Sequence, residues 1–214
     1  KAAQLAVMEA LRSGWDRVWN AVAPGGAGGE VFQALAEKYA EVHRAYHNLT
    51  HIRDCLDQLI PVRHLLSRPD EVELAIWFHD AIYDTRQPDN EARSAEWAEF
   101  MLRENGVPAD VIHRVGELVM LTAHRSSQLT GDDAILCDID LAILGAAAMR
   151  FDTYDAAIRL EYSWVPNDVF RRERGRVLGY FLARPHIYHS QFFHERLEAQ
   201  ALANLLRVMP RYSS

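Results

Sequence analysis

The stretch Glu73-Leu-Ala-Ile-Trp-Phe-His-Asp-Ala-Ile-Tyr83 indicates both the fold and the place where chemistry is to be expected. Its side chains are apolar nearly all round a helical wheel, which is typical of a helix buried inside a protein. His79 and Asp80 interrupt this apolar run. A lone buried carboxylate is costly unless it is paired or binds a metal ion, so Asp80 needs a partner. The residues alone leave two explanations equally open: an ordinary partner such as an arginine, or a metal or catalytic role.

The rest of the chain follows the same helical pattern. Apolar residues recur at intervals of three and four, and β-branched runs with a period of two are missing. The pattern predicts an all-α bundle of about ten helices in one domain, 1–214, with an N-terminal helix and glycine-rich loop in 1–29 and the core in 30–208. The predicted helices cover 3–22, 30–43, 48–60, 70–82, 90–104, 108–123, 132–146, 151–163, 166–183 and 191–208. The predicted N-caps are Asn48, Asp70, Asp89 and Asp132.

The composition argues against two classes of protein, those that bind nucleic acid and those that span a membrane. The 214 residues include 23 Lys and Arg against 30 Asp and Glu, a formal charge of −7. This balance argues against a nucleic acid polymer as the main partner, because phosphate contacts need a basic patch. No apolar run approaches the roughly 18 residues of a membrane span, and the two cysteines, Cys55 and Cys137, suit a reducing compartment. We therefore expect a cytoplasmic protein that binds no membrane.

A second polar signal is the stretch Tyr46-His-Asn-Leu-Thr-His-Ile52. His47 and His51 share one face if a helix already runs there, whereas they flank a helix start if Asn48 is the N-cap. Alone, the pair is best explained as a solvated helix entry. Close to a buried His-Asp pair an imidazole becomes a good candidate ligand, because imidazole and carboxylate together suit a borderline divalent cation.

A third signal is the pair Asp138 and Asp140 in the apolar stretch 132–145. At about 100° per residue the two carboxylates point about 200° apart, so one helix cannot aim both at one ion. The apolar stripe leaves Asp140 slightly nearer the buried face. The other aspartate is then a cap, an exposed group or a group that supports a ligand.

Taken in order, these residues resemble the HD-domain metal-dependent phosphohydrolases, and among them a branch of small stand-alone bacterial proteins described as predicted phosphohydrolases. The resemblance covers roughly residues 30–208 and rests on six stretches: Tyr46-His-Asn-Leu-Thr-His-Ile52, Trp77-Phe-His-Asp-Ala-Ile-Tyr83, Asn90-Glu-Ala-Arg-Ser-Ala95, Leu121-Thr-Ala-His124, Asp138-Ile-Asp-Leu-Ala-Ile-Leu-Gly145 and Ile158-Arg-Leu-Glu-Tyr162. The ordered set is specific to the family and not to a substrate.

The resemblance implies an HD-like helical bundle and one divalent metal ion, which would be Mn, Fe, Co, Ni, Zn or Mg. Its ligands would be His51, His79, Asp80 and Asp140, with His79 and Asp80 also in the catalytic role. Extra histidines mark family members with two metals. His113 and His124 fall in the right interval, but they are separated by roughly 16 Å of helix, so we expect a single ion.

The expected activity is hydrolysis of a phosphoester in a small phosphorylated metabolite or nucleotide, with a metal-activated water as nucleophile. The candidate substrate-binding residues are His47, Glu91, His124 and Arg159. The arginines in 171–176 are better explained as a solvated helix face. The alternative function is a metal-containing nucleotide-binding or regulatory module without catalysis, and the expected assembly is a monomer or homodimer.

Overall fold

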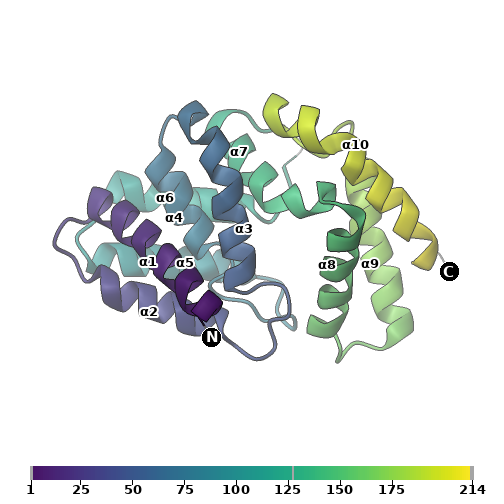
Figure 1. Ribbon diagram of the computed structural model, residues 1–214, viewed down its shortest axis with the longest axis horizontal. Coiled ribbons are helices and arrows are strands. Elements are labelled where there is room, and N and C mark those ends of the chain that lie inside the picture. The colour runs from purple at the N-terminus through teal and green to yellow at the C-terminus, as the bar shows by residue number, and fades with distance from the viewer. Residues whose placement is uncertain (1, 127, 213–214) are drawn as a thin grey trace.

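The computed structural model describes residues 2–126 and 128–212, and within this part every regular element is a helix (Figure 1). The predicted all-α fold is confirmed. The elements are α1 (Ala2–Val22), α2 (Gly28–Tyr39), α3 (Leu49–Leu59), η1 (Ile60–Leu65), α4 (Pro69–Phe78), α5 (Asn90–Glu104), α6 (Ala109–Leu121), α7 (Gly131–Asp140), η2 (Leu141–Gly145), α8 (Ala148–Glu161), α9 (Asn167–Leu182), α10 (Gln191–Val208) and η3 (Met209–Arg211), where η marks a 3-10 helix. Among these described residues, no helix combines the length and the apolar character that crossing a bilayer requires.

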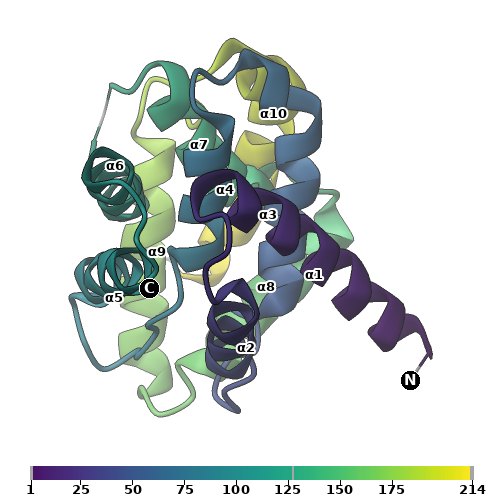
Figure 2. The same cartoon turned by 90° about the vertical axis from the view of Figure 1, so that its left-hand side faces the viewer.

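Helix α4 lies at the centre of the larger group of helices (Figure 2). It packs against α1, α3, α5, α6 and α7, and all its residues from 71 to 78 are buried. Aromatic rings fill the space between α1, α2 and α4: Trp15 meets Trp77 edge-on with ring centroids 5.4 Å apart and lies 6.3 Å from Phe32. The indole nitrogen of Trp15 donates to the carbonyl of Gly28 at 2.7 Å, so its one polar group is satisfied in the core.

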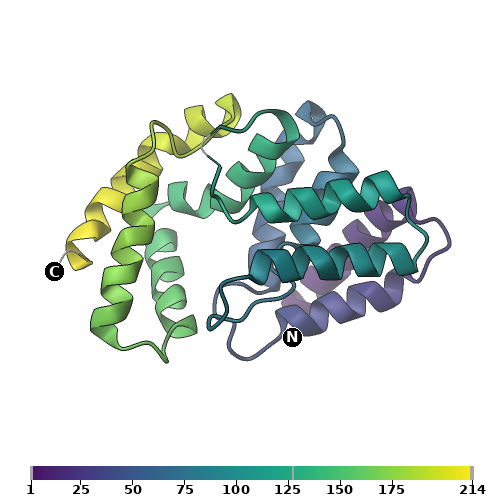
Figure 3. The same cartoon turned by 180° about the vertical axis from the view of Figure 1, so that it is seen from behind.

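The last three α-helices form the other end of the molecule (Figure 3). The 3-10 helix η2 leads out of α7 and packs against both α8 and α10, while α9 packs against α10 and η3. Helices α7 and η2 therefore join the two ends, and Asp140 lies at the point where one passes into the other.

Three predicted boundaries are wrong by more than three residues. Helix α2 ends at Tyr39 rather than 43, α4 ends at Phe78 rather than 82, and 132–146 divides into α7 and η2. In each case the apolar pattern continues past the end of the α-helix, so periodicity alone extends the prediction too far.

Two of the four predicted N-caps are correct in position. Asn48 caps α3 and accepts a hydrogen bond from Thr50 N at 2.8 Å, whereas Asp89 stands at the N-cap of α5 without a side-chain bond. Asp70 and Asp132 lie inside the first turn of their helices, so these two predictions are wrong. Asp132 instead accepts both backbone N–H groups of residues 67 and 68, which ties α7 to the start of α4.

Candidate metal centre and its cleft

Four side chains from three parts of the chain converge in the interior. His51 lies in the first turn of α3, His79 and Asp80 follow α4, and Asp140 is the last residue of α7. His51 Nε2 lies 3.1 Å from both His79 Nε2 and Asp140 Oδ1, and 3.5 Å from Asp80 Oδ2. His79 Nε2 lies 3.0 Å from Asp80 Oδ2 and 3.4 Å from Asp140 Oδ1. The structure thus brings together the four residues that the sequence predicts as metal ligands.

The spacing of these atoms matches that of ligands around one ion. Metal–ligand bonds of about 2.0–2.2 Å that meet at octahedral or tetrahedral angles place neighbouring donors about 2.8–3.6 Å apart. The five separations given above fall in this range. The group whose donor atoms all lie within 4.8 Å of one another consists of His51, His79 and Asp140, and Asp80 contacts this group through the two histidines. His79 Nδ1 lies 2.8 Å from the carbonyl of Ile76. Because a carbonyl only accepts, Nδ1 carries the proton of the neutral ring, which leaves the Nε2 lone pair directed at the other donors.

His79 and the two aspartates of the group shift one another's pKa values. Burial lowers the pKa of His79, but Asp80 and Asp140 outweigh burial and hold it well above the usual value. Burial likewise works to raise the pKa of Asp140, and the neighbouring histidines, His79 first, hold it well below the usual value. Two carboxylates packed against two imidazoles can be neutralised either by protons or by a cation.

Arg44 holds the chain at the turn where α4 ends and Asp80 follows. Its guanidinium, whose side chain has no exposed surface, donates to the carbonyls of Asp80 (2.7 Å), Ala81 (3.0 Å) and His47 (3.0 Å). These bonds satisfy carbonyl groups at the end of α4 that helix continuation would otherwise satisfy. Sequence reasoning missed Arg44, which is 36 residues before Asp80 and carries no local signal.

His124 contacts the group from the outside. It follows α6 in a left-handed conformation, with φ of 53°, and its Nε2 lies 2.7 Å from Asp140 Oδ2. Its carbonyl accepts from Tyr180 Oη on α9 at 3.1 Å and from Arg184, which follows the end of that helix; these bonds hold the strained residue in place. His113, by contrast, is exposed on α6 and pairs with Glu117, so it lies outside the group.

A second polar chain begins at His47. His47 Nδ1 lies 2.7 Å from Glu161 Oε2, the same oxygen that accepts from Tyr83 Oη at 2.8 Å. Glu161 Oε1 accepts the backbone N–H groups of Tyr46 and His47 at 2.7 and 2.9 Å. Burial lowers the pKa of His47, but Asp80 and Glu161 outweigh burial and raise it; burial opposes ionisation of Glu161, yet His47 and the backbone N–H groups lower its pKa to about 2. Sequence reasoning singled out His47 and missed its partner, although Glu161 lies in one of the six matching stretches.

The donors open into a cleft of about 950 Å³ between α8 and α9 on one side and the start of α5 and the end of α6 on the other. His47, Asp80, Glu91, His124 and Asp140 all line it, so three of the four predicted substrate-binding residues reach the cleft. Its other walls are rich in aromatic rings, namely Tyr46, Tyr83, Tyr154, Tyr162, Trp164, Phe170, Tyr180 and Phe181.

Arg159 is the predicted substrate-binding residue that the structure does not bring to the cleft. Its guanidinium donates to the carbonyls of Tyr162 (2.6 Å) and Val165 (3.1 Å) and lies 4.7 Å from the ring centroid of Phe170. The side chain thus fixes the turn between α8 and α9, and the expectation that it binds phosphate gains no support.

Asp138 and the arginines of α9 take structural positions. Asp138 is fully buried and accepts the N–H groups of His189 (2.8 Å) and Ser190 (2.7 Å), where the chain enters α10. Arg174 is buried in an ion pair with Asp155, whereas the exposed neighbours at 172 and 176 pair with the carboxylate at 173. The prediction of a solvated face therefore fails for Arg174.

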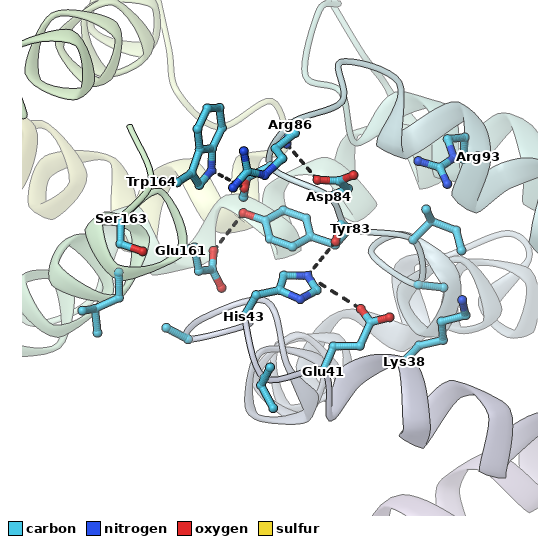
Figure 4. Close-up of a pocket in the computed structure, with 16 residues that line it drawn as sticks. Lys38, Glu41, His43, Tyr83, Asp84, Arg86, Arg93, Glu161, Ser163 and Trp164 are labelled. Carbon is cyan, nitrogen blue, oxygen red and sulfur yellow. Dashed lines mark hydrogen bonds and ion pairs between the residues drawn. The ribbon is translucent and has the colours of Figure 1, made fainter. Parts of the chain in front are cut away.

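A second hollow of about 860 Å³ lies on the other side of Tyr83 (Figure 4). Tyr83, Thr85 and Trp164 line both spaces and form the wall between them. Trp164 Nε1 donates to Thr85 Oγ1 at 2.8 Å, and the guanidinium of Arg86 lies 4.4 Å from the centroid of the indole. Lys38 lies across the hollow from this wall (Figure 4).

No protein-family model, curated protein or solved structure matches the chain, so the residues and their geometry carry the functional argument.

Proposed function

We propose that this protein is a metal-dependent phosphohydrolase of the HD type that acts on a small phosphorylated metabolite or nucleotide. One observation carries the proposal: the Nε2 atoms of His51 and His79 and carboxylate oxygens of Asp80 and Asp140 lie 3.0–3.5 Å from one another in the five measured pairs. The resemblance of the ordered motifs to HD proteins supports the same activity.

The donor set fits a divalent cation of intermediate softness. Two imidazole nitrogens and two carboxylates suit Mn, Fe, Co, Ni or Zn, and the oxygen donors leave Mg compatible. Cys55 lies 3.7 Å from His51 Nδ1, but burial, with Asp140, raises the pKa of its thiol well above the usual value. Cys55 is not a member of the group whose donor atoms all lie within 4.8 Å of one another.

When bound at these four residues, a divalent cation supplies a water of lowered pKa and neutralises charge on a phosphoryl group. Asp80 lines the cleft as well as contacting both histidines, so it is placed to accept a proton from the attacking water. His47 lies in the same cleft with Nδ1 bound by Glu161, which leaves Nε2 for a phosphoryl oxygen or for the leaving group. His124 keeps Asp140 oriented through its outer oxygen.

The walls of the cleft favour a substrate with a flat, largely apolar body and few charges. Eight aromatic side chains line it, and such rings bind flat groups by stacking. Two arginines line it, and both already have carboxylate partners: Arg174 pairs with Asp155 and Arg176 with Glu173. Arg159 and Arg184 are not among the lining residues and donate to backbone carbonyls. A monophosphate ester with an aromatic or alicyclic body therefore fits better than a polyphosphate.

The test combines metal analysis with an activity panel. Protein purified without chelators is assayed against phosphomonoesters and phosphodiesters with Mn²⁺, Co²⁺, Ni²⁺ or Mg²⁺, alongside Asp80→Asn and the control His113→Ala. We expect bound metal, turnover in the wild type and control, and loss of turnover in Asp80→Asn. A protein without bound metal, or turnover that survives Asp80→Asn unchanged, would refute the proposal. Metal-dependent stabilisation by nucleotides without product would instead indicate the regulatory module.

A further inference from the structure

A second group of metal-binding side chains lies where α9 is connected to α10, away from the four residues described above. His186 in the connecting segment and His194 and Glu198 on α10 offer one donor atom each, and these three atoms all lie within 4.8 Å of one another. His194 Nδ1 is 3.5 Å from Glu198 Oε2, and the rings of His186 and His194 meet edge-on with centroids 4.6 Å apart. In the part of the chain that the structure describes, the only other group that meets this criterion is His51, His79 and Asp140 in the centre.

The local sequence explains why the three donors face one another. His194 and Glu198 are four residues apart on one helix and therefore lie on the same face. Glu198 is buried and accepts the backbone N–H groups of Ile187 (Oε1, 2.8 Å) and Tyr188 (Oε2, 3.1 Å). These bonds hold the connecting segment in contact with α10. His186, which precedes Ile187, therefore lies beside His194. Each carboxylate oxygen keeps a second lone pair for another partner.

A histidine and a glutamate four residues apart on a helix are often no more than a surface pair, and the chain contains such a pair for comparison. His113 Nε2 lies 3.4 Å from Glu117 Oε1 on α6, with both side chains largely exposed and no third donor. The group at α10 differs in two respects. His194 Nδ1 is buried and makes no hydrogen bond, because its approach to Glu198 lacks hydrogen-bond geometry, and a second imidazole adjoins it. A buried polar atom without a partner is costly, and a cation would satisfy it.

We propose that His186, His194 and Glu198 form a second divalent-cation site, with two nitrogen donors and one oxygen donor. This donor set suits Zn²⁺ or Ni²⁺ and not Ca²⁺ or Mg²⁺, which prefer oxygen alone. The separation of 3.5 Å between His194 Nδ1 and Glu198 Oε2 matches two ligands of one ion. His186 is exposed, so water completes the coordination and exchange with solvent is open.

The site would fasten the connecting segment to α10. The same segment contains His189 and Ser190, whose N–H groups bind Asp138 on α7. An ion held by His186 and α10 therefore stabilises the segment that joins the C-terminal helices to α7. The role is structural, and it does not depend on whether the central group hydrolyses a phosphoester.

The experiment measures zinc per chain by equilibrium dialysis of the full-length protein, wild type against His186→Ala. His186 is exposed, so its replacement leaves the fold intact, which circular dichroism checks. We expect the wild type to bind one more equivalent than His186→Ala, whether the central group binds zinc or not. The matched control His113→Ala should bind as much as the wild type.

Thermal unfolding gives a second readout. Zinc should raise the melting temperature of His186→Ala less than that of the wild type and of His113→Ala, because one stabilising ion is absent. Equal zinc stoichiometry in wild type and His186→Ala would overturn the proposal. A loss of the same size in His113→Ala would overturn it as well, because zinc would then be binding to any exposed histidine.

Discussion

Asp138 and Asp140 allow a sharp test of the site, because they lie two residues apart and the structure gives them opposite tasks. Asp138 binds the N–H groups of His189 and Ser190, and Asp140 lies against His51 and His79. We predict that Asp138→Asn weakens the fold and leaves cation binding almost unchanged. Asp140→Asn should weaken cation binding strongly.

The expected loss for Asp138→Asn follows from its two hydrogen bonds, of 2.8 and 2.7 Å. Hydrogen bonds to a charged acceptor contribute about 1.5–3 kcal/mol each. The amide keeps one acceptor and turns a donor toward the other N–H group. Burial raises the pKa of Asp138, so the ionised form is held at some cost and the lower part of the range applies. We expect the free energy of unfolding to fall by about 2–3 kcal/mol, or about 4–12 °C in melting temperature for a chain of this size.

The assays are urea unfolding followed by circular dichroism and calorimetric titration with Mn²⁺. For Asp140→Asn we expect cation affinity to fall by about 100-fold or more, because even groups that only support a ligand are worth about 10–100-fold. For Asp138→Asn we expect less than about a threefold change in affinity, because the carboxylate contacts none of the donors. A loss of cation affinity in Asp138→Asn equal to that in Asp140→Asn would refute the assignment of the two roles.

Three further predictions concern other parts of the molecule. His47 lowers the pKa of Glu161 to about 2 from 4.5, so the stability that Glu161 contributes is present above about pH 4.5 and is lost as the pH falls toward 2. Wild type and Glu161→Gln should therefore differ in unfolding free energy by about 3 kcal/mol at neutral pH, and acid denaturation should show this difference disappearing between pH 4.5 and 2. A difference that does not change with pH would contradict the reasoning. Gly28→Ala places a methyl group 2.4 Å from Cδ1 of the buried Trp19, so urea unfolding should show a loss of about 1–3 kcal/mol, and a variant as stable as wild type would show that the contact relaxes freely. Trp164→Ala removes part of the wall of the cleft and should raise KM for an aromatic phosphoester about tenfold without changing kcat, whereas a fall in kcat alone would place the indole elsewhere in the reaction.

The helices could be predicted from the sequence because each carries its own apolar face. The ranges for α5 and α10 agree with the structure at both ends, and most others agree to within three residues. For α4 the prediction fails because a distant side chain binds the carbonyl groups beyond the end of the helix. The end of α4 depends on Arg44, which takes the carbonyls of Asp80 and Ala81. No pattern within 73–83 reveals that contact.

Some residues of the candidate site could likewise be predicted from the sequence, and others could not. His79 and Asp80 stand out because they interrupt an apolar run, and the motif order adds His51 and Asp140. Spacing alone could not choose between Asp138 and Asp140, since the choice depends on which direction α7 faces in the assembled bundle. Glu161 could not be recognised from its neighbours either, because its partners are 78 to 115 positions away in the sequence.

Arg44 has a consequence for the proposed binding of an ion. The guanidinium locks the turn that carries Asp80 to the loop that carries His47, and it uses only backbone carbonyls and Glu41 to do so. The proposed donors are consequently preorganised by the folded chain itself, so binding an ion would cost little further conformational freedom. Donors held in this way would discriminate between cations by size, because they would not move inward or outward to suit each one.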